Sequence, residues 1–274
     1  MDDKTCVEFL QWALPLLKMR WAGFRKVRKQ VCKRIARRFK ALRLRDVTAY
    51  RDYLLGHCEE WTVVDDICRI SISRFFRDRL LFSSLQRDIL PELLRQVKAR
   101  GETMLHIWSA GCAAGEEPYS LSILWGLGLS QRAADAQMNI DIIATDSDQR
   151  LLERAIRACY PYSSLKNLPE DWRQRAFVEN NKEFCLCAAF RHGVNFVRQD
   201  LRLETPPGIF DLIMCRNLVF TYFEDNLQRQ ILRRLANILR PAGLLVIGIH
   251  ETLPQDYDGF AVWSQRLGVY QRRS

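Results

Sequence analysis

Hydrophobic residues recur at two different periods along this chain, and the period changes near residue 100. Between residues 21 and 42 the apolar side chains lie three or four positions apart, which predicts an amphipathic helix. Similar patterns predict helices at residues 47–55, 63–68 and 75–95. No segment before residue 100 has the pattern of a buried strand, so this part of the chain is expected to be helical.

From residue 104 onward, short apolar runs alternate with helical stretches. The strands are expected at residues 104–109, 140–144, 194–197, 210–215 and 244–249, and the helices between them at 119–127, 151–158 and 227–239. This alternation is typical of a mostly parallel sheet covered by helices. We therefore predict an α/β protein with a helical domain at residues 1–100 and a sheet domain at residues 101–274.

The net charge of +10 is concentrated at one end of the chain. Residues 1–50 hold 14 Lys or Arg and 4 Asp or Glu, whereas residues 51–274 hold 28 of each kind. The cations crowd the polar face of the predicted helix at 21–42, and no Asp or Glu relieves their repulsion between Phe9 and Leu42. This face is either a docking surface for an acidic partner or a solvated surface, and we favour docking through Arg28, Lys33, Arg34, Arg37 and Arg38.

Other features of the sequence restrict the class of protein. No apolar run approaches the roughly 18 residues of a membrane-spanning helix. The chain opens with Asp2 and Asp3 rather than with a basic leader, so we expect a cytoplasmic protein. The nine cysteines are scattered and form no Cys-x-x-Cys pair, so we expect neither a disulfide framework nor a metal site. Cys185 and Cys187 would then be two small side chains on one face of a strand.

Polar residues follow the predicted strands, at the sheet edge where ligands bind in open parallel sheets. The first strand leads into a loop of small residues that contains Gly111, and the second strand leads to Asp146, which could accept the hydroxyls of a ribose. Glu116 and Glu117 stand where a helix N-terminus would otherwise bind a phosphate, and the Gly-x-Gly-x-x-Gly pattern is absent. Carboxylates suit a ligand with a cationic end, and the sequence lacks a phosphate-binding loop, so these residues favour S-adenosylmethionine over NAD.

Four motifs closely resemble those of the CheR-type chemoreceptor methyltransferases. These motifs are Phe-Phe-Arg-Asp at 75–78, Gly-Cys-Ala-Ala-Gly-Glu-Glu-Pro-Tyr-Ser at 111–120, Ala-Thr-Asp at 144–146 and Phe-Asp-Leu-Ile-Met-Cys-Arg-Asn at 210–217. The resemblance implies a Rossmann-like class I methyltransferase sheet. It also implies transfer of a methyl group from S-adenosylmethionine to glutamate side chains of an acidic helical substrate, such as a chemoreceptor cytoplasmic domain.

The resemblance also implies roles for individual residues. Arg77 would lie beside the methyl donor and hold the acceptor carboxylate, and Tyr222 would help to fix that carboxylate. The residues implied to contact S-adenosylmethionine are Ser73, Arg77, Gly111, Glu117, Asp146, Asp200, Leu201, Arg216 and Asn217. No metal is implied, because a glutamate with a pKa of about 4.3 is already an ionised nucleophile at neutral pH.

The sequence departs from the family pattern at two places. Ser71 and Ser73 stand where the family has Asn and Thr, which keeps the hydroxyl group and loses the amide. One additional residue separates Asn217 from the Tyr222-Phe223 pair, which leaves open whether Tyr222 occupies the place of the family's tyrosine. Residues 177–193 are expected to form two or three short strands, as a structural flap rather than a site that docks a receptor tail.

Two other functions remain open from the sequence. One is a methyltransferase for nucleic acid or a small molecule, although few aromatic residues on the basic helix are placed to stack on bases. The other is a regulatory module that binds S-adenosylmethionine without catalysis.

Overall fold

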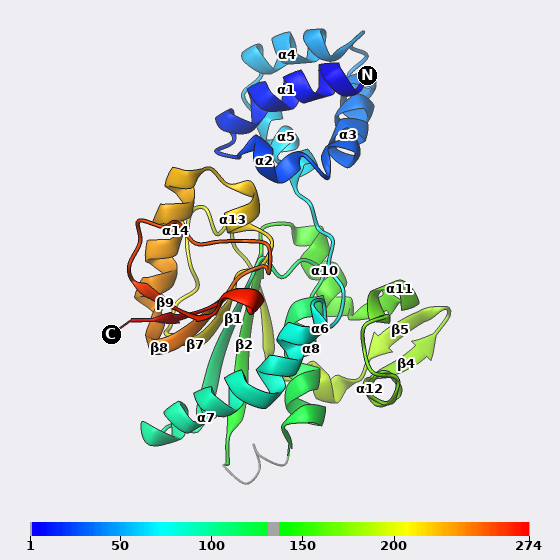
Figure 1. Ribbon diagram of the computed structural model, residues 1–274. Coiled ribbons are helices and arrows are strands. Elements are labelled where there is room, and N and C mark those ends of the chain that lie inside the picture. Colours follow the sequence, from blue (N-terminus) through cyan, green and yellow to red (C-terminus); the bar gives the residue numbers. More distant parts are fainter. Residues whose placement is uncertain (1, 131–136, 274) are drawn as a thin grey trace. The chain divides into compact units, whose positions relative to one another are not determined.

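The computed structural model describes residues 2–130 and 137–273. The chain divides into two compact units, one formed by residues up to 71 together with 218–228, and the other by residues 72–217 together with 229 onward (Figure 1). The division therefore lies near residue 71 and not near residue 100. The reason is that the helices between residues 79 and 99 share one core with the sheet, in which Leu85 and Leu93 belong to the same buried cluster as Ile107.

The first unit is helical, as expected. Its helices are α1 (Asp3–Leu16), α2 (Trp21–Phe24), α3 (Arg28–Ala41), α4 (Val47–Gly56), α5 (Glu60–Cys68) and α13 (Val219–Tyr222). The single helix expected at residues 21–42 is two helices, because a turn closed by a hydrogen bond from Val27 N to Phe24 O separates α2 from α3. The sequence pattern did not predict α1, which Asp2 caps by accepting a hydrogen bond from Thr5 N at 2.9 Å.

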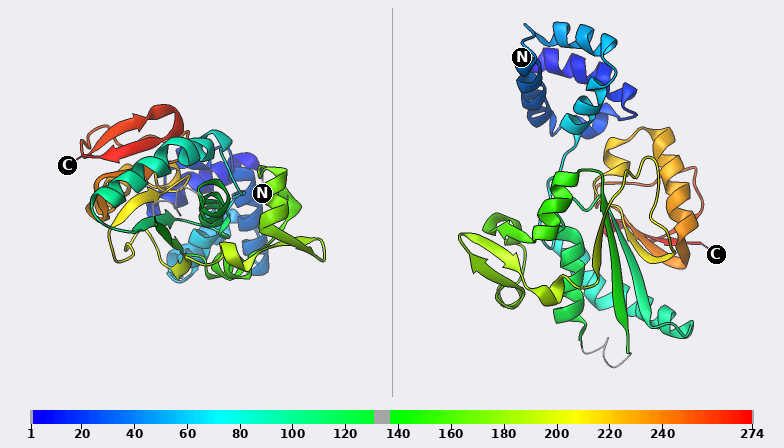
Figure 2. Two further views of the ribbon diagram at one scale, coloured as in Figure 1. Left: turned by 90° about the horizontal axis from the view of Figure 1, so that it is seen from below. Right: turned by 180° about the vertical axis from the view of Figure 1, so that it is seen from behind.

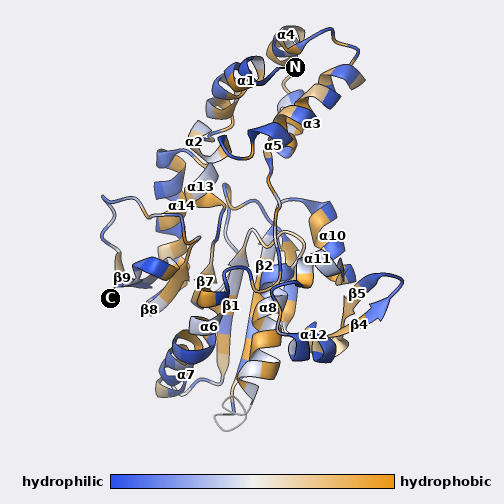
Figure 3. Ribbon diagram, turned by 45° about the vertical axis from the view of Figure 1, so that its right-hand side comes forward, coloured by the Kyte–Doolittle hydropathy of each residue, from blue (hydrophilic) through white to orange (hydrophobic). Residues whose placement is uncertain are grey.

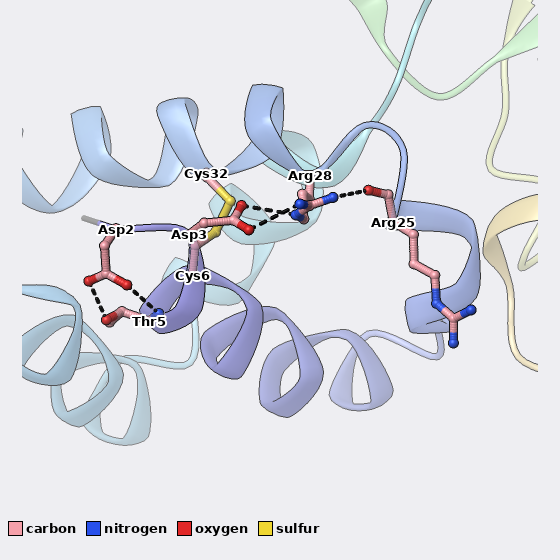
Figure 4. The surroundings of a disulfide bond; sticks show 7 residues. All are labelled: Asp2, Asp3, Thr5, Cys6, Arg25, Arg28 and Cys32. Atoms are coloured by element: carbon pink, nitrogen blue, oxygen red, sulfur yellow. Dashed lines mark hydrogen bonds and ion pairs between the residues drawn. A yellow bond between two sulfur atoms is a disulfide. The ribbon is translucent and has the colours of Figure 1, made fainter.

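Two disulfides show that the expectation of no disulfide framework was wrong. Cys6 of α1 is bonded to Cys32 of α3, with the two Cα atoms 5.9 Å apart (Figure 4). In the other unit, Cys185 is bonded to Cys159 on the neighbouring strand, while Cys187 is a free thiol. Both pairs are separated by 26 residues and become neighbours only through tertiary packing, which cysteine spacing alone does not reveal.

The second unit is built on a seven-stranded sheet with the order β6-β2-β1-β7-β8-β10-β9. The first five strands in this order are parallel, and β10 runs antiparallel to both of its neighbours, β8 and β9. The strands are β1 (Met104–Ala110), β2 (Asn139–Asp146), β6 (Val194–Arg198), β7 (Phe210–Met214), β8 (Leu239–Val246), β9 (Phe260–Ser264) and β10 (Val269–Arg272). The predicted α/β fold is confirmed, and the sequence pattern missed only β9 and β10 among these strands.

The second unit also contains helices and short helical turns. They are α6 (Arg79–Ser84), η1 (Leu85–Ile89), α7 (Leu90–Ala99), α8 (Glu116–Ile123), η2 (Leu124–Gly128), α10 (Gln149–Arg157), α11 (Tyr162–Leu165), α12 (Glu170–Ala176), η3 (Ala188–Phe190) and η4 (Gln265–Leu267), while α14 (Asp225–Ile238) begins in the first unit and ends in the second. Figure 3 shows the two unlike sides of α10, which buries Leu152 and Ala155 and exposes charged residues. The helix expected from residue 75 begins at Arg79, because Phe76 and Asp78 have positive φ angles of 52° and 63°.

A small three-stranded sheet projects from this unit (Figure 2). It consists of β3 (Cys159–Pro161), β4 (Phe177–Asn180) and β5 (Glu183–Leu186) in the order β3-β5-β4. Asn181 and Lys182, with φ angles of 48° and 68°, form the two-residue turn of the β4–β5 hairpin. Of the two or three strands expected at 177–193, β4 and β5 are present in that range, and the third strand of the small sheet, β3, precedes it. Among the described residues, no helix has the length and apolar character needed to span a bilayer.

Candidate functional site

The strand order places the predicted site residues at one edge of the large sheet. The chain moves outward from β1 to β2 and β6 on one side, and then returns to β7 and β8 on the other side of β1. Loops at the carboxyl ends of β1 and β7 therefore leave the sheet in opposite directions, which opens a crevice for a ligand in folds of this kind. The loop after β1, Asp146 at the end of β2 and the segment after β7 all lie at this edge.

The loop after β1 is held to the end of β2 by its backbone. Gly111 N and Cys112 N both donate to Thr145 O, at 2.8 and 2.9 Å, and Ala113 N donates to Asp146 Oδ2 at 2.9 Å. Gly111 has a φ angle of 76°, a conformation in which glycine is favoured. The structure therefore brings two predicted cofactor residues, Gly111 and Asp146, into one connected loop.

Glu117 and Arg216 form a polar contact at the centre of the site. Glu117 lies in the first turn of α8, and its Oε2 accepts a hydrogen bond from Arg216 Nη1 at 3.0 Å. The Arg216 side chain is only 4% exposed, and its Nη2 also pairs with Asp78. Ser109 Oγ donates to the other Glu117 oxygen at 2.8 Å. These contacts fix the position of a carboxylate that sequence analysis assigned to the cofactor.

Glu116 is the second carboxylate at the start of α8, and it is more deeply buried than Glu117. Burial raises the pKa of the Glu116 carboxyl above its usual value, while a hydrogen bond to Ser73 partly offsets this effect. Among the described residues, no partner is present for the buried Glu116 Oε2. Ser73, a predicted cofactor residue, is thus linked to α8 through the neighbour of Glu117.

The other predicted residues differ in their surroundings. Arg77 Nη1 donates to Ile72 O at 2.8 Å, which leaves the rest of the guanidinium for other contacts.

Asp200 is held by Arg202, whose Nη2 donates to Asp200 Oδ2 at 2.7 Å, and Leu201 beside it is buried. Asn217 N donates to Glu251 Oε2 at 2.8 Å. Asp200 and Asn217 are thus each held by a neighbouring residue, Arg202 and Glu251 respectively.

Tyr222 belongs to the first unit, whereas Arg77 belongs to the second. The Tyr222 ring packs against Phe24, with the ring centroids 5.1 Å apart, and its carbonyl oxygen accepts a hydrogen bond from Arg20 N at 2.8 Å. The catalytic role assigned to Tyr222 therefore stays a prediction.

The five predicted docking cations fall into two groups. Arg28, Arg34 and Arg38 have partners in the first unit: Arg28 pairs with Asp3 at the surface (Figure 4), Arg34 donates to Ile67 O and Arg69 O, and Arg38 pairs with Glu60. Lys33 and Arg37 are exposed, and within the part of the chain that the structure describes neither forms an ion pair. Lys29 and Lys40 of α3 are also exposed, at spacings of three and four residues, so these four cations share one face of α3.

Sequence analysis missed three residues that shape the site. Ser109 donates a hydrogen bond to Glu117, and Asp78 accepts one from Arg216. Asp78 belongs to one of the motifs that carry the resemblance, and Ser109 lies just before another. Glu251 accepts hydrogen bonds from Asn217 N and Gly248 N at 2.8 and 2.6 Å, and no feature of the sequence indicated this role.

The charges of these residues fit S-adenosylmethionine. Its sulfonium and ammonium groups suit a carboxylate such as that of Glu117, its ribose hydroxyls suit Asp146, and its own carboxylate suits a cation. Arg216 Nε is buried, and the described residues offer it no partner, so the site retains an unused donor. No group of three or more His, Cys, Asp or Glu side chains suited to a metal ion occurs within residues 2–130 and 137–273.

Comparison with known proteins identifies the family of this chain. The family described as "CheR methyltransferase, SAM binding domain" matches residues 71–269. A chemotaxis protein methyltransferase of Listeria monocytogenes serovar 1/2a is 36% identical over 190 residues, which cover 69% of this chain and 68% of the relative. A chemotaxis protein methyltransferase of Escherichia coli K12 is 31% identical over 239 residues, which cover 82% of this chain and 76% of the relative.

Proposed function

Because this chain belongs to the CheR methyltransferase family, we propose that it forms methyl esters on glutamate side chains of a chemoreceptor-like signalling protein. It is an S-adenosylmethionine-dependent methyltransferase with a class I fold. The observation that supports the proposed site most directly is the buried contact between Arg216 and Glu117 at the switch point of the sheet. We further propose that the reaction takes place in the cytoplasm.

Methyl transfer to a glutamate needs little chemical activation. Bound S-adenosylmethionine supplies a methyl group on a positively charged sulfur atom, and the bond from that methyl to a carboxylate oxygen forms as its bond to sulfur breaks. The glutamate is already ionised near neutral pH, so the protein does not have to remove a proton. The work left to the side chains is to hold the carboxylate in line with the methyl group and to exclude water.

Arg77 is the residue that we propose for holding the acceptor carboxylate. Its guanidinium uses Nη1 to reach Ile72 O, and a planar guanidinium has further donors that can bind a carboxylate. Under this proposal Tyr222 orients the same carboxylate, and Ser73, Glu117 and Asp146 bind the methyl donor.

The acceptor is proposed to dock on the exposed cations of the first unit. Lys29, Lys33, Arg37 and Lys40 form one row along α3, and an acidic helix with carboxylates three and four residues apart would match their spacing. Arg28, Arg34 and Arg38 would support this surface from within the unit. We therefore expect charge reversal at Lys33 and Arg37 to weaken docking, and charge reversal at Lys98 of α7 to serve as the matched control.

The test uses labelled S-adenosylmethionine, the full chain and a purified chemoreceptor cytoplasmic fragment, followed by mild alkali and capture of volatile methanol. Alkali-labile label that Arg77→Ala abolishes, while Arg95→Ala in α7 leaves it unchanged, would support the proposal. Alkali-stable label would indicate a nitrogen, carbon or nucleic-acid acceptor and would contradict it. Binding of the cofactor without transfer to any acceptor would indicate a regulatory module.

A further inference from the structure

A buried carboxylate joins the segment after β7 to the segment after β8. The Glu251 residue is 6% exposed, and its Oε2 accepts hydrogen bonds from Asn217 N at 2.8 Å and from Gly248 N at 2.6 Å. Asn217 follows β7, and Gly248 follows β8. Burial of a carboxylate is costly unless it accepts hydrogen bonds, so these two contacts hold both segments to Glu251.

Glu251 is also held in place independently of Asn217. Its backbone N donates to Gly248 O at 2.8 Å, while Gly248 N donates to its carboxylate, so the two residues exchange hydrogen bonds across a tight turn. The start of this turn is tied to the residue before β10, because Ile247 N donates to Gly268 O at 2.8 Å. The Glu251 carboxylate is therefore a fixed acceptor to which Asn217 attaches.

Asn217 has a backbone conformation that depends on its neighbours. Its φ angle is 55°, in the left-handed region that is unfavourable for most residues other than glycine and that Asn tolerates better than most. Such a conformation persists where surrounding contacts hold it. The hydrogen bond from Asn217 N to Glu251 is a contact of this kind. Asn217 is also the last residue of the second unit before the chain enters the first.

Gly248 leaves room for the Asn217 side chain beside Glu251. A Cβ atom on Gly248 would lie 2.4 Å from Asn217 Nδ2 and 2.8 Å from Glu251 Oε2. The Asn217 amide and the Glu251 carboxylate therefore meet where a larger residue would place its side chain. Any residue other than glycine at this position would displace one or both of them.

We propose that Glu251 is a positioning residue that holds Asn217 in the conformation that binds S-adenosylmethionine. It acts through the backbone N of Asn217, without a contact to the cofactor of its own. Because a single carbonyl oxygen can accept both hydrogen bonds, this role requires an acceptor at this place rather than a negative charge. The inference rests on the proposed role of Asn217 at the cofactor.

The experiment measures the dissociation constant of S-adenosylmethionine by calorimetry and the unfolding temperature, both on the full chain. We expect Glu251→Ala to weaken binding about tenfold. Glu251→Gln should stay within about threefold of the wild type, because its amide oxygen still accepts both hydrogen bonds. Gly248→Ala should weaken binding as well, because the added methyl group displaces the Asn217 amide or the Glu251 carboxylate.

Asp211 supplies a matched control for loss of stability. Its carboxylate is also buried and also accepts a hydrogen bond from a backbone N–H, that of His106 at 2.9 Å. It lies near the start of β7, whereas Asn217 follows the end of that strand. Asp211→Ala should therefore lower the unfolding temperature and leave the dissociation constant unchanged.

Wild-type binding by Glu251→Ala would overturn the inference. An equal loss of binding by Asp211→Ala would reduce the effect to general destabilisation, and an equal loss by Glu251→Gln would show that charge is required instead of an acceptor. If Glu251→Ala does not fold, wild-type binding by Gly248→Ala would overturn the inference in its place.

The test is separate from the proposed reaction because no acceptor is present. Transfer to an acceptor other than glutamate would contradict the proposed function and would leave these binding results as they are. Unchanged cofactor binding by Asn217→Ala would instead contradict the cofactor role of Asn217 on which the inference rests.

Discussion

Arg38 of α3 donates from Nε and Nη2 to the two carboxylate oxygens of Glu60 in α5, at 2.7 and 2.6 Å. The Glu60 side chain is only 5% exposed, and Tyr50 Oη also donates to it at 2.7 Å. A cation that the sequence placed on a docking face therefore holds two helices of the first unit together. Its neighbour Arg37 is exposed and has no ion pair within the described part of the chain.

Substitutions of these two neighbours should have different effects on stability. Arg38→Ala leaves the buried Glu60 carboxylate without its cation, and we expect it to lower the free energy of unfolding by about 3 kcal/mol. Arg37→Ala, at an exposed position, should stay within about 0.5 kcal/mol of the wild type. Urea unfolding followed by circular dichroism measures both values. Similar stability of the two variants would contradict the assignment of Arg38 to the interior of the unit.

The Arg38–Glu60 pair should also make stability depend on pH. The hydrogen bond from Arg38 holds the pKa of Glu60 below its usual value of 4.5. The carboxylate therefore stabilises the folded state fully above about pH 4.5, and this contribution is lost as the pH falls below that value through the lowered folded pKa. Chemical unfolding at a series of pH values should show a shallower acid slope for Glu60→Gln than for the wild type. Equal slopes would show that Glu60 is not the responsible group.

The disulfide between Cys6 and Cys32 should stabilise the first unit. It closes a loop with a sequence separation of 26 residues, for which the chain-entropy estimate is about 3.5 kcal/mol. The variant with Cys6→Ser and Cys32→Ser should therefore unfold at a lower temperature than the oxidised wild type. Adding reductant to the wild type should bring its unfolding temperature closer to that of the variant. Unfolding curves that do not respond to reductant, together with titration of nine free thiols, would show that neither disulfide forms.

Gly115 should be more sensitive to substitution than another glycine with the same backbone conformation. Gly115 has a φ angle of 87°, and an added Cβ would lie 2.9 Å from Ala155 Cβ. Gly101 has a φ angle of 72° and open space around it. Gly101→Ala should cost about 1 kcal/mol from its backbone alone. Gly115→Ala should cost more and should also weaken cofactor binding, because Gly115 caps the helix that carries Glu117. Equal losses of stability and unchanged binding would contradict this.

The sequence predicted the parallel part of the sheet because its buried strands are short apolar runs between helical patterns. β7, which is buried along its whole length, shows this most clearly. The strands β9 and β10 were missed because neither is a fully buried apolar run like β7: β9 is partly exposed at the edge of the sheet, and β10 is only four residues long. The division between the units was placed too late, since amphipathic helices look alike whether they pack on other helices or on a sheet.

The candidate site was predictable in part for a similar reason. Glu117, Asp146 and Arg216 could be found because each follows a strand or begins a helix within a recognisable motif. The contacts that Arg216 makes could not be predicted from the sequence. Its partner Asp78, for example, is 138 residues away in the sequence and meets it only in the folded chain. The charge pattern of α3 gave a cationic face but could not distinguish Arg38, which Glu60 holds, from Arg37, which is exposed.

The most direct test of the proposed function locates the transferred methyl group. A chemoreceptor cytoplasmic fragment is incubated with the enzyme and deuterated S-adenosylmethionine, and its peptides are sequenced by mass spectrometry. We predict deuterated methyl esters on glutamate side chains of the receptor helices, which disappear after mild alkali and are absent with Arg77→Ala. Deuterated methyl groups confined to other residue types, or unchanged glutamate methylation by Arg77→Ala, would contradict this account.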